Sequence, residues 1–447
     1  MVVVIKVGPA APADVMTFLE PYASLVARAQ SKHAMERYTT GLLADFPRKT
    51  ASDLGRGVAG TNGQRLQEFL TRTVWEPREM DRVRVQQMVA QASAGQGVQI
   101  IDDTGFAKKG THSVGVARQY SGTLGRVDNC QVLVTSHYVD GHFDWPITAR
   151  LYLPEGWTQD EDRLRAAKVP AGTAFKTKGE IALELIDVGI AAGVPTRAVL
   201  SDAGYGDQPL FLDGLEARGL SYVVAVASST RFRVAQDVEE DPGEGPVPPY
   251  QGQGRPRRAR RLEDRVPSRA ANTLLEALPQ DAWQAITWRE GSKGALAKGF
   301  AMVRVYRVGR RGKSLPTAGW LLGQRALDGR QGESKYCFAW GLDSLALGDL
   351  VALAHHRWVI ERFYQDAKGE LGLDNYEGRF WTGLHRHVAL VMLAHSFLSL
   401  RRTNPDLSGP RPHYTAQMES GPPSVTQIGS FPPSGTPKPG FCAEVSA

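Results

Sequence analysis

Two adjacent carboxylates that follow an apolar run constrain this chain more than any other feature. Residues 100–110 read IIDDTGFAKKG, in which Ile100 and Ile101 precede Asp102 and Asp103. A strand that ends in aspartates places charge at the edge of an open α/β sheet, where ligands bind. Carboxylates crowded there repel one another unless a hard cation such as Mg²⁺ lies between them. An Asp-Thr-Gly turn that closes a hairpin is the alternative, since Asp and Gly are common in turns.

The length and composition are those of an ordinary globular protein of two or three domains. The chain has 447 residues, of which 42% are hydrophobic and 22% are charged. No apolar run approaches the roughly 20 residues that cross a bilayer, and no positive region precedes the N-terminal apolar stretch. The three cysteines lack CxxC spacing, which disfavours a zinc site or a disulfide framework. We therefore expect a cytoplasmic protein without a membrane span.

The excess of positive charge is concentrated in two short segments. The formal net charge is +6, and residues 255–265 and 307–313 are dense in arginine. The first segment contains Arg257, Arg258, Arg260 and Arg261. Basic patches of this kind neutralise phosphates and favour a nucleic-acid partner. A solvated flexible loop is the alternative interpretation.

Residues 1–95 are predicted to form a helical N-terminal domain that binds DNA. Apolar residues recur at helical spacing from about residue 12 onward. Two short helices are expected at 48–58 and 63–75, separated by a glycine turn and flanked by arginines. This arrangement resembles a helix-turn-helix, although many short helical bundles have the same pattern.

Residues 96–228 are predicted to alternate strands and helices. Strands are expected after Val98 and at 112–122, 129–139 and 146–154, followed by a helix at 177–192. A second short apolar run, 197–202, again ends in an aspartate, Asp202. A helix and a β-branched strand follow, at 209–218 and 221–227. The strand–helix–strand order predicts a parallel component in the sheet.

The remaining chain divides into three parts. Residues 229–345 are predicted to be a β-rich insertion with a basic loop, and its strands are expected at 283–290, 300–308, 319–326 and 336–342. Residues 346–402 are predicted to be helical, as two helices at 345–373 and 382–402. Residues 403–447 are crowded with Pro, Gly and Ser and are predicted to be a disordered tail.

A third acid is flanked by cations on the first of these helices. Glu361 and Lys368 lie four and eleven residues after Arg357. At 100° per residue the three side chains fall within roughly 40° of one helix face. One carboxylate between cations suits phosphoryl transfer on DNA. A solvated Arg–Glu pair at i,i+4 is the alternative.

The order of these acids resembles that of the DDE transposases of bacterial insertion sequences. The resemblance is to the cut-and-paste group with a β-rich insertion before the glutamate and the signature Y-x2-R-x3-E-x6-K. Arg357, Glu361 and Lys368 match that spacing, whereas Ala354 stands at the tyrosine position. The stretches IIDDTGFAKKG, HSVGVARQY, NCQV and SDAGYGD are also similar. The likeness covers about residues 35–400 and implies an α/β fold, a ribonuclease H-like mixed sheet flanked by helices.

The resemblance implies a metal-dependent site for DNA cleavage and strand transfer. Asp103, Asp202 and Glu361 would hold two divalent cations, Mg²⁺ or alternatively Mn²⁺. The DNA phosphates would be bound by Arg357 and Lys368, with Lys108 and Lys109 extending the positive surface. The family pattern places the ligand just before the threonine, which selects Asp103. Neighbours on a strand point to opposite faces, so Asp102 is the alternative ligand.

The implied partners are the terminal inverted repeats of an element, target DNA, and a second copy of the chain in a nucleoid-associated dimer. A catalytically silent DNA-binding protein and a stand-alone metal nuclease are the alternatives. Two histidine pairs, His355-His356 and His385-x-His387, are expected to be surface or DNA-facing residues rather than zinc ligands. Trp358 and Trp381 are expected in the core, although stacking on a flipped base is the alternative.

Overall fold

The structure is a computed structural model that describes most of residues 12–403. Within that range it leaves out residues 96, 123–124, 142, 244–246, 248, 250–251, 253–261, 292–293, 309–316 and 328–331. Two sequence predictions therefore lie outside the described residues. They are the arginines Arg257, Arg258, Arg260 and Arg261, and the tail beyond residue 403.

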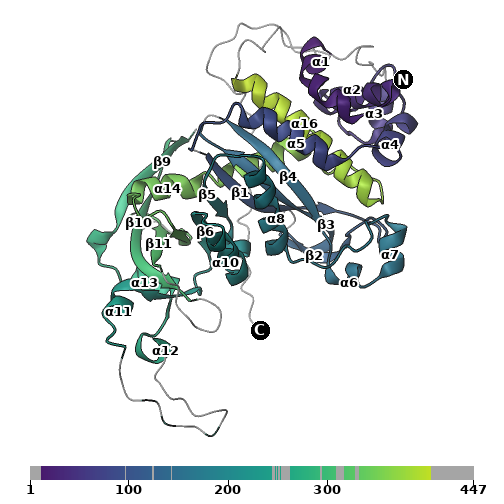
Figure 1. Cartoon of the computed structure of the whole chain (residues 1–447). Coiled ribbons are helices and arrows are strands. Elements are labelled where there is room, and N and C mark those ends of the chain that lie inside the picture. The colour runs from purple at the N-terminus through teal and green to yellow at the C-terminus, as the bar shows by residue number, and fades with distance from the viewer. Residues whose placement is uncertain are drawn as a thin grey trace.

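One mixed sheet of twelve strands runs through the molecule (Figure 1). Its order is β2-β3-β1-β5-β6-β12-β11-β10-β7-β8, with β4 on β3 and β9 on β10. The first strands are β1 (Gly97–Ala107), β2 (Ala117–Ser121), β3 (Arg126–Val139), β4 (Asp144–Tyr152), β5 (Thr196–Ser201) and β6 (Tyr222–Val226). The remaining strands are β7 (Arg231–Val234), β8 (Arg269–Ala270), β9 (Gln284–Gly291), β10 (Gly294–Arg307), β11 (Gly319–Arg325) and β12 (Lys335–Trp340). The α/β fold class, a ribonuclease H-like mixed sheet flanked by helices, is confirmed.

Strand β1 does not end at the paired aspartates, which corrects the sequence prediction. Residues 97–101 pair in parallel with β5, and the last pair is Ile101 with Ser201. Antiparallel pairing with β3 continues to Ala107, so Asp102 and Asp103 lie in mid-strand. Only the parallel neighbour stops there, because the chain turns after Ser201 into α9 (Ala203–Gly206). The aspartates therefore still lie at the carboxyl end of a parallel strand, which is where ligands of open α/β sheets bind.

Helices cover the two faces of the sheet and form separate cores. On one face, α8 (Lys178–Ala191) and α10 (Pro209–Ala217) pack with Ile101 and Val199. On the other face, Ile100 packs in the core that contains α14 (Leu347–His355), α15 (Trp358–Gly369) and α16 (Trp381–Thr403). Since side chains alternate along a strand, Asp102 shares the face of Ile100 and Asp103 that of Ile101.

The predicted helix over residues 345–373 is two helices. The backbone N–H groups of His356, Val359 and Ile360 donate to carbonyls three residues earlier, a tighter spacing than an α-helix has. This turn separates α14 from α15 and places Arg357 at the start of α15. The predicted helix is therefore interrupted just before Arg357, the first residue of the set Arg357, Glu361 and Lys368.

The N-terminal helices pack against α16 and share its core (Figure 1). They are α1 (Ala13–Leu19), the 3₁₀ helix η1 (Glu20–Leu25), α2 (Ala29–Leu43), α3 (Ala51–Gly57), α4 (Gly63–Thr71) and α5 (Pro77–Val89). The predicted pair of short helices corresponds to α3 and α4, which begin after the capping side chains of Thr50 and Asn62. Contact between this pair and DNA stays a prediction, as do the predicted domain boundaries.

The predicted insertion strands correspond to β9–β12, and they continue the core sheet. Strand β12 pairs antiparallel with β6, and β11 and β10 follow outward. The short helices of this region are α11 (Ala235–Glu239), α12 (Leu262–Arg265), α13 (Ala271–Glu276) and η2 (Gln280–Ala282). Two more, α6 (Glu155–Thr158) and α7 (Glu161–Ala166), follow β4. Among the described helices, none has the length and apolarity that a membrane span requires.

A buried arginine joins α5 to the sheet and generates a stability prediction. The fully buried Arg84 donates to the carbonyls of Pro146 and Ile147 in β4 and to Asp81 Oδ1 at 2.7 Å. We expect Arg84→Ala to destabilise the protein by about 3–5 kcal/mol, because it leaves a buried carboxylate without its cation. The matched control is Arg82→Ala on the same helix, an exposed pair with Glu79 that should change stability by less than about 0.5 kcal/mol. Urea denaturation measures both, and equal midpoints would contradict the prediction.

Candidate active site

Asp102 is a buried carboxylate in the middle of β1. The residue is 9% exposed, and its Oδ2 atom accepts a hydrogen bond from Arg357 Nη1 at 3.2 Å. Burial, together with the negative charge of Asp202, raises the pKa of Asp102 to about 7. A carboxylate with this pKa is poorly compensated at neutral pH and favours a nearby cation.

Asp202 follows the last residue of β5 and caps α9. Its side chain accepts from the backbone N–H of Tyr205 at 3.3 Å. Because Ile101 pairs with Ser201, the next positions in register are Asp102 and Asp202. Burial raises the pKa of Asp202, which Arg357 opposes and Asp103 reinforces. Asp102 and Asp202 are therefore neighbouring carboxylates with little solvent exposure at the end of β5.

Arg357 joins two of the three predicted regions of the site. Its Nη2 atom donates to Glu361 Oε1 at 2.8 Å while Nη1 reaches Asp102. Although burial lowers it, the pKa of Arg357 is raised overall by Asp102, Glu361 and Asp202. The i,i+4 pair expected from the sequence therefore exists, but its guanidinium is also bound to the strand. Glu361 remains 63% exposed at the rim of the crevice.

Lys368 lies farther along α15 and also faces β1. Its Nζ atom donates to the carbonyl of Gly105 at 3.1 Å and lies 5.6 Å from the ring centroid of Phe106. Burial lowers the pKa of Lys368. Arg357 and Lys368 thus both contact β1, whereas Glu361 contacts Arg357.

Asp103 points to the opposite face of the sheet. Its Oδ2 atom pairs with Lys178 Nζ at 2.9 Å and accepts from the hydroxyl of Tyr205 at 3.4 Å. Lys178 opens α8, the helix that covers this face. The structure therefore separates Asp103 from Arg357 and Glu361 and groups Asp102 with them.

Four further residues border the aspartates, and the sequence reasoning did not identify their roles. Lys178 and Tyr205 contact Asp103, and the hydroxyls of Tyr364 and Thr135 lie 2.6 Å apart beside Asp102. Thr135 pairs directly with Asp102 across β1 and β3. Burial, and then the charge of Asp102, raises the pKa of Tyr364 well above its usual value. Only Tyr205 belongs to a stretch, SDAGYGD, that the sequence marked as similar to a family core.

The donor set suits a hard divalent cation. Carboxylate oxygens are the ligands of Mg²⁺, and the raised pKa values of Asp102 and Asp202 reflect carboxylates that a bound cation would stabilise. In the arrangement described, Glu361 is paired with Arg357. Across the described residues, no three His, Cys, Asp or Glu side chains already form a group that could hold a metal ion.

The pair His385 and His387 is not a surface feature, which corrects the expectation for it, whereas His355 and His356 are half-buried and line a cavity. The His387 ring is fully buried between the hydroxyl of Tyr38 and the carbonyl of Gly372. Burial lowers the pKa values of His385 and His387 to about 4, so both are neutral. The half-buried His355 stacks on Trp288 with ring centroids 4.2 Å apart. These rings serve packing rather than solvent contact.

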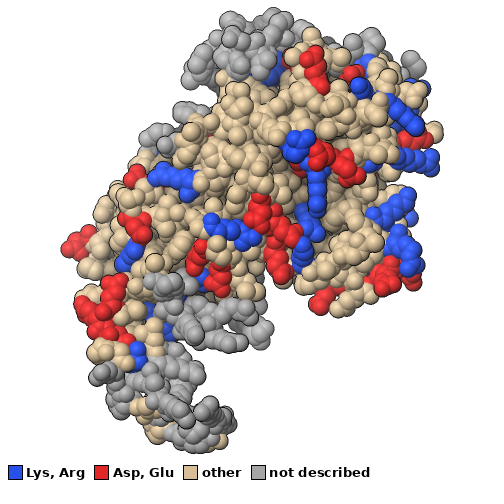
Figure 2. Space-filling view, in the orientation of Figure 1, with Lys and Arg blue, Asp and Glu red and all other residues tan. Residues whose placement is uncertain are grey.

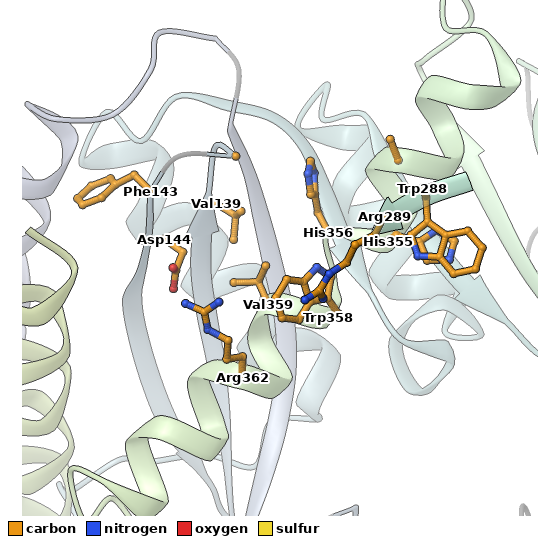
Figure 3. Close-up of a pocket in the computed structure, with 12 residues that line it drawn as sticks. Val139, Phe143, Asp144, Trp288, Arg289, His355, His356, Trp358, Val359 and Arg362 are labelled. Carbon is orange, nitrogen blue, oxygen red and sulfur yellow. The ribbon is translucent and has the colours of Figure 1, made fainter. Parts of the chain in front are cut away.

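Trp358 lines a cavity rather than the core. The cavity has a volume of about 350 Å³ and lies between β9, the loop after β3 and the α14–α15 turn. Figure 3 shows Arg289 overlying Trp358 at its centre, where the guanidinium is 4.2 Å from the ring centroid. Trp358 also borders a second cavity of about 390 Å³ that includes Arg357 and Glu361. The core prediction holds only for Trp381, which packs on His385.

The two lysines after β1 differ from one another. Lys108 is half-buried, and its Nζ atom donates to the carbonyl of Tyr376 at 2.7 Å. Lys109 is exposed. Lys108 therefore fixes the loop before α16, and contact of either lysine with DNA stays a prediction.

Comparison with known proteins places these residues in a family. Residues 21–295 match the family described as "DDE superfamily endonuclease". The chain belongs to this family. Among curated proteins, it is 32% identical over 224 residues to the "Probable transposase for insertion sequence element IS701" of Microchaete diplosiphon. That match covers 49% of this chain and 56% of the relative, so the chain spans about half the length of the relative.

The family match includes some of the acids but not all of them. Asp102, Asp103 and Asp202 lie within residues 21–295, whereas Glu361 and Lys368 lie beyond this range. The matched range thus includes the strands that carry the aspartates. Glu361 is connected to the aspartates through Arg357, whose guanidinium contacts both Asp102 and Glu361.

The environment of Asp102 leads to a pH-dependent stability prediction. The unfolded pKa near 3.8 lies below the folded value of about 7, so the folded protein binds the extra proton between these values. The carboxyl therefore costs stability above pH 7, and the cost disappears as the pH falls toward 4. In the presence of EDTA, Asp102→Asn should raise the melting temperature at pH 8 and change it little at pH 4.5.

The stabilisation at pH 8 should be at most about 4 kcal/mol, the equivalent of the pKa difference. Thermal unfolding measured by circular dichroism at both pH values provides the test. The control is Asp162→Asn, an exposed acid whose removal should leave both melting temperatures unchanged. A lower melting temperature for Asp102→Asn at pH 8 would contradict the prediction.

Proposed function

We propose that this protein is a DNA transposase that binds the ends of an insertion sequence and catalyses metal-dependent strand cleavage and strand transfer. The observation that carries the proposal is the guanidinium of Arg357, which joins Asp102 of β1 to Glu361 of α15 beside Asp202. Family membership and the similarity to a probable transposase support the same function. A cut-and-paste route is the specific form that we propose.

In the proposed site, Asp102, Asp202 and Glu361 are the metal ligands. Asp102 replaces Asp103, the ligand inferred from the family pattern, because only Asp102 faces Arg357 and Glu361. Two divalent cations, Mg²⁺ or Mn²⁺, would supply activation of water or a 3′-hydroxyl and stabilisation of the departing oxygen. The acids hold these cations, and the rigid pairing of β1 with β5 fixes the positions of Asp102 and Asp202.

The cations of α15 are proposed to bind phosphates next to the scissile bond. Arg357 presents a planar guanidinium suited to two phosphate oxygens, whereas Lys368 acts as a point charge. Because Lys368 lies at Gly105, three residues beyond Asp102 on β1, its phosphate would lie toward the end of that strand. Together the two residues orient the strand that is cut.

The proposed partners are double-stranded DNA at the terminal inverted repeats, target DNA, and a second copy of the chain. Two element ends must be brought together, and a homodimer provides one site for each. The reaction is proposed to occur at the nucleoid in a bacterial cytoplasm.

Nicking of a supercoiled plasmid that carries the gene with its natural flanking DNA tests the function. With Mg²⁺, we expect wild-type protein to nick it and Asp102→Asn, Asp202→Asn and Glu361→Gln to be slower by at least about 100-fold. Asp103→Asn is the matched control, since it alters the adjacent carboxylate on the other face and should remain within about tenfold of wild type.

Gel shifts with the flanking DNA should show that all four variants still bind. Loss of cleavage in Asp103→Asn alone would reassign the ligand to Asp103. Binding without metal-dependent cleavage by wild-type protein would overturn the enzyme and favour the catalytically silent DNA-binding alternative.

A further inference from the structure

A cavity lies where three loops meet beyond the end of β1. Two of them are residues 108–116 and 374–381, and the third segment, residues 160–168, consists of helix α7 and the residues on either side of it. They are joined by hydrogen bonds from Val114 N to Arg379 O at 3.1 Å, Trp381 N to Ala167 O at 2.9 Å, and Arg163 Nη2 to Thr111 O at 3.0 Å. The space between them has a volume of about 540 Å³. The loops therefore form a connected three-loop pocket, and the catalytic proposal makes no use of it.

The three-loop pocket is rich in cations. Arg163, Arg379 and His112 line it, and Lys168 lies at its edge with Nζ 4.6 Å from the ring centroid of Phe380. Arg379 and Lys168 are exposed, and within the described part of the chain neither forms an ion pair. Figure 2 shows basic side chains gathered around α7, with an acidic group beside them. Two uncommitted cations in a concave site favour an anionic ligand.

The acid in the lining is already engaged. Asp160 caps α7 through a hydrogen bond from the backbone N–H of Arg163 at 2.9 Å. Arg163 is held more firmly than the other cations, because its guanidinium also lies 3.8 Å from the ring centroid of Trp157. Arg163 is thus held by several contacts, whereas Arg379 and Lys168 are exposed and can approach a ligand.

The pocket lies in line with the candidate active site. Val114 and Trp157 pack in the same core as Ile100, so the pocket is on the Asp102 side of the sheet. Lys368 contacts the carbonyl of Gly105 and Lys108 contacts the carbonyl of Tyr376. Thr111 and His112 of the pocket follow Ala107, the last residue of the strand that carries Asp102.

We propose that the three-loop pocket binds a backbone phosphate of the duplex DNA that is cut at Asp102, at a point beyond the end of β1. The row of cations leading from the acids to the pocket favours a polymeric anion over a free one. This inference rests on the proposed function, because it takes the duplex to be the one cut at Asp102. It adds the direction in which that duplex leaves the site, along β1 toward α7.

The test measures how salt weakens DNA binding. The double variant Arg379→Ala/Lys168→Asn removes both free cations, and asparagine is chosen because Lys168 has a φ of 53° that Asn tolerates. Binding of a labelled 30-base-pair mixed-sequence duplex is followed by fluorescence anisotropy across a KCl series. The slope of log Kd against log salt should fall by about 1 relative to wild type, since the pocket is proposed to contact one phosphate and each phosphate contact contributes about 0.9.

The matched control is Arg197→Ala, which removes an exposed arginine at the far end of β5 and should leave the slope unchanged. Equal slopes for the double variant and wild type would overturn the proposal. The double variant could also lose binding of inorganic phosphate, measured by calorimetry, while its salt slope for DNA stays unchanged. That result would assign the pocket to a free anion and would also overturn the proposal. Failure of the proposed function can be distinguished from failure of this inference. In that case wild-type protein does not nick the plasmid, whatever the salt slope of DNA binding.

Discussion

The arrangement of the candidate site depends on one interaction, the compensation of the Asp102 and Asp202 carboxylates by a cation at the end of β5. Asp102 and Asp202 occupy adjacent positions in register, both are poorly solvated, and burial raises the pKa of each. Such an arrangement is unfavourable unless a cation compensates it. Arg357 provides this charge from the start of α15, and that helix must begin where it does for the guanidinium to reach Asp102.

The two faces of β1 give adjacent aspartates different environments. Asp102 lies on the α15 side with Arg357, whereas Asp103 lies on the α8 side with Lys178 and Tyr205. The same alternation divides Ile100 and Ile101 between two cores. A shift of one residue in register would exchange the acids and both cores at once, so the apolar packing fixes which acid faces the α15 helix.

Much of the fold follows from local patterns. The strand at 146–154 was predictable from its alternation, and the helix at 177–192 from its apolar period and the Thr177 capping box. The break at His356 and the extension of β1 to Ala107 were not predictable, since both depend on tertiary partners. Asp102 and Asp103 are polar enough to suggest a strand end, but pairing with β3 satisfies their backbone groups.

The sequence by itself determined which acids and cations are available and the spacing that puts Arg357, Glu361 and Lys368 on one face of a helix. Periodicity is a local property, so it can be read without the fold. Only the tertiary structure decided that this face lies against β1, that Asp102 shares it, and that Lys178 holds Asp103 away from it. Those contacts join residues 75 to 263 positions apart in the chain, and no local pattern encodes such distances.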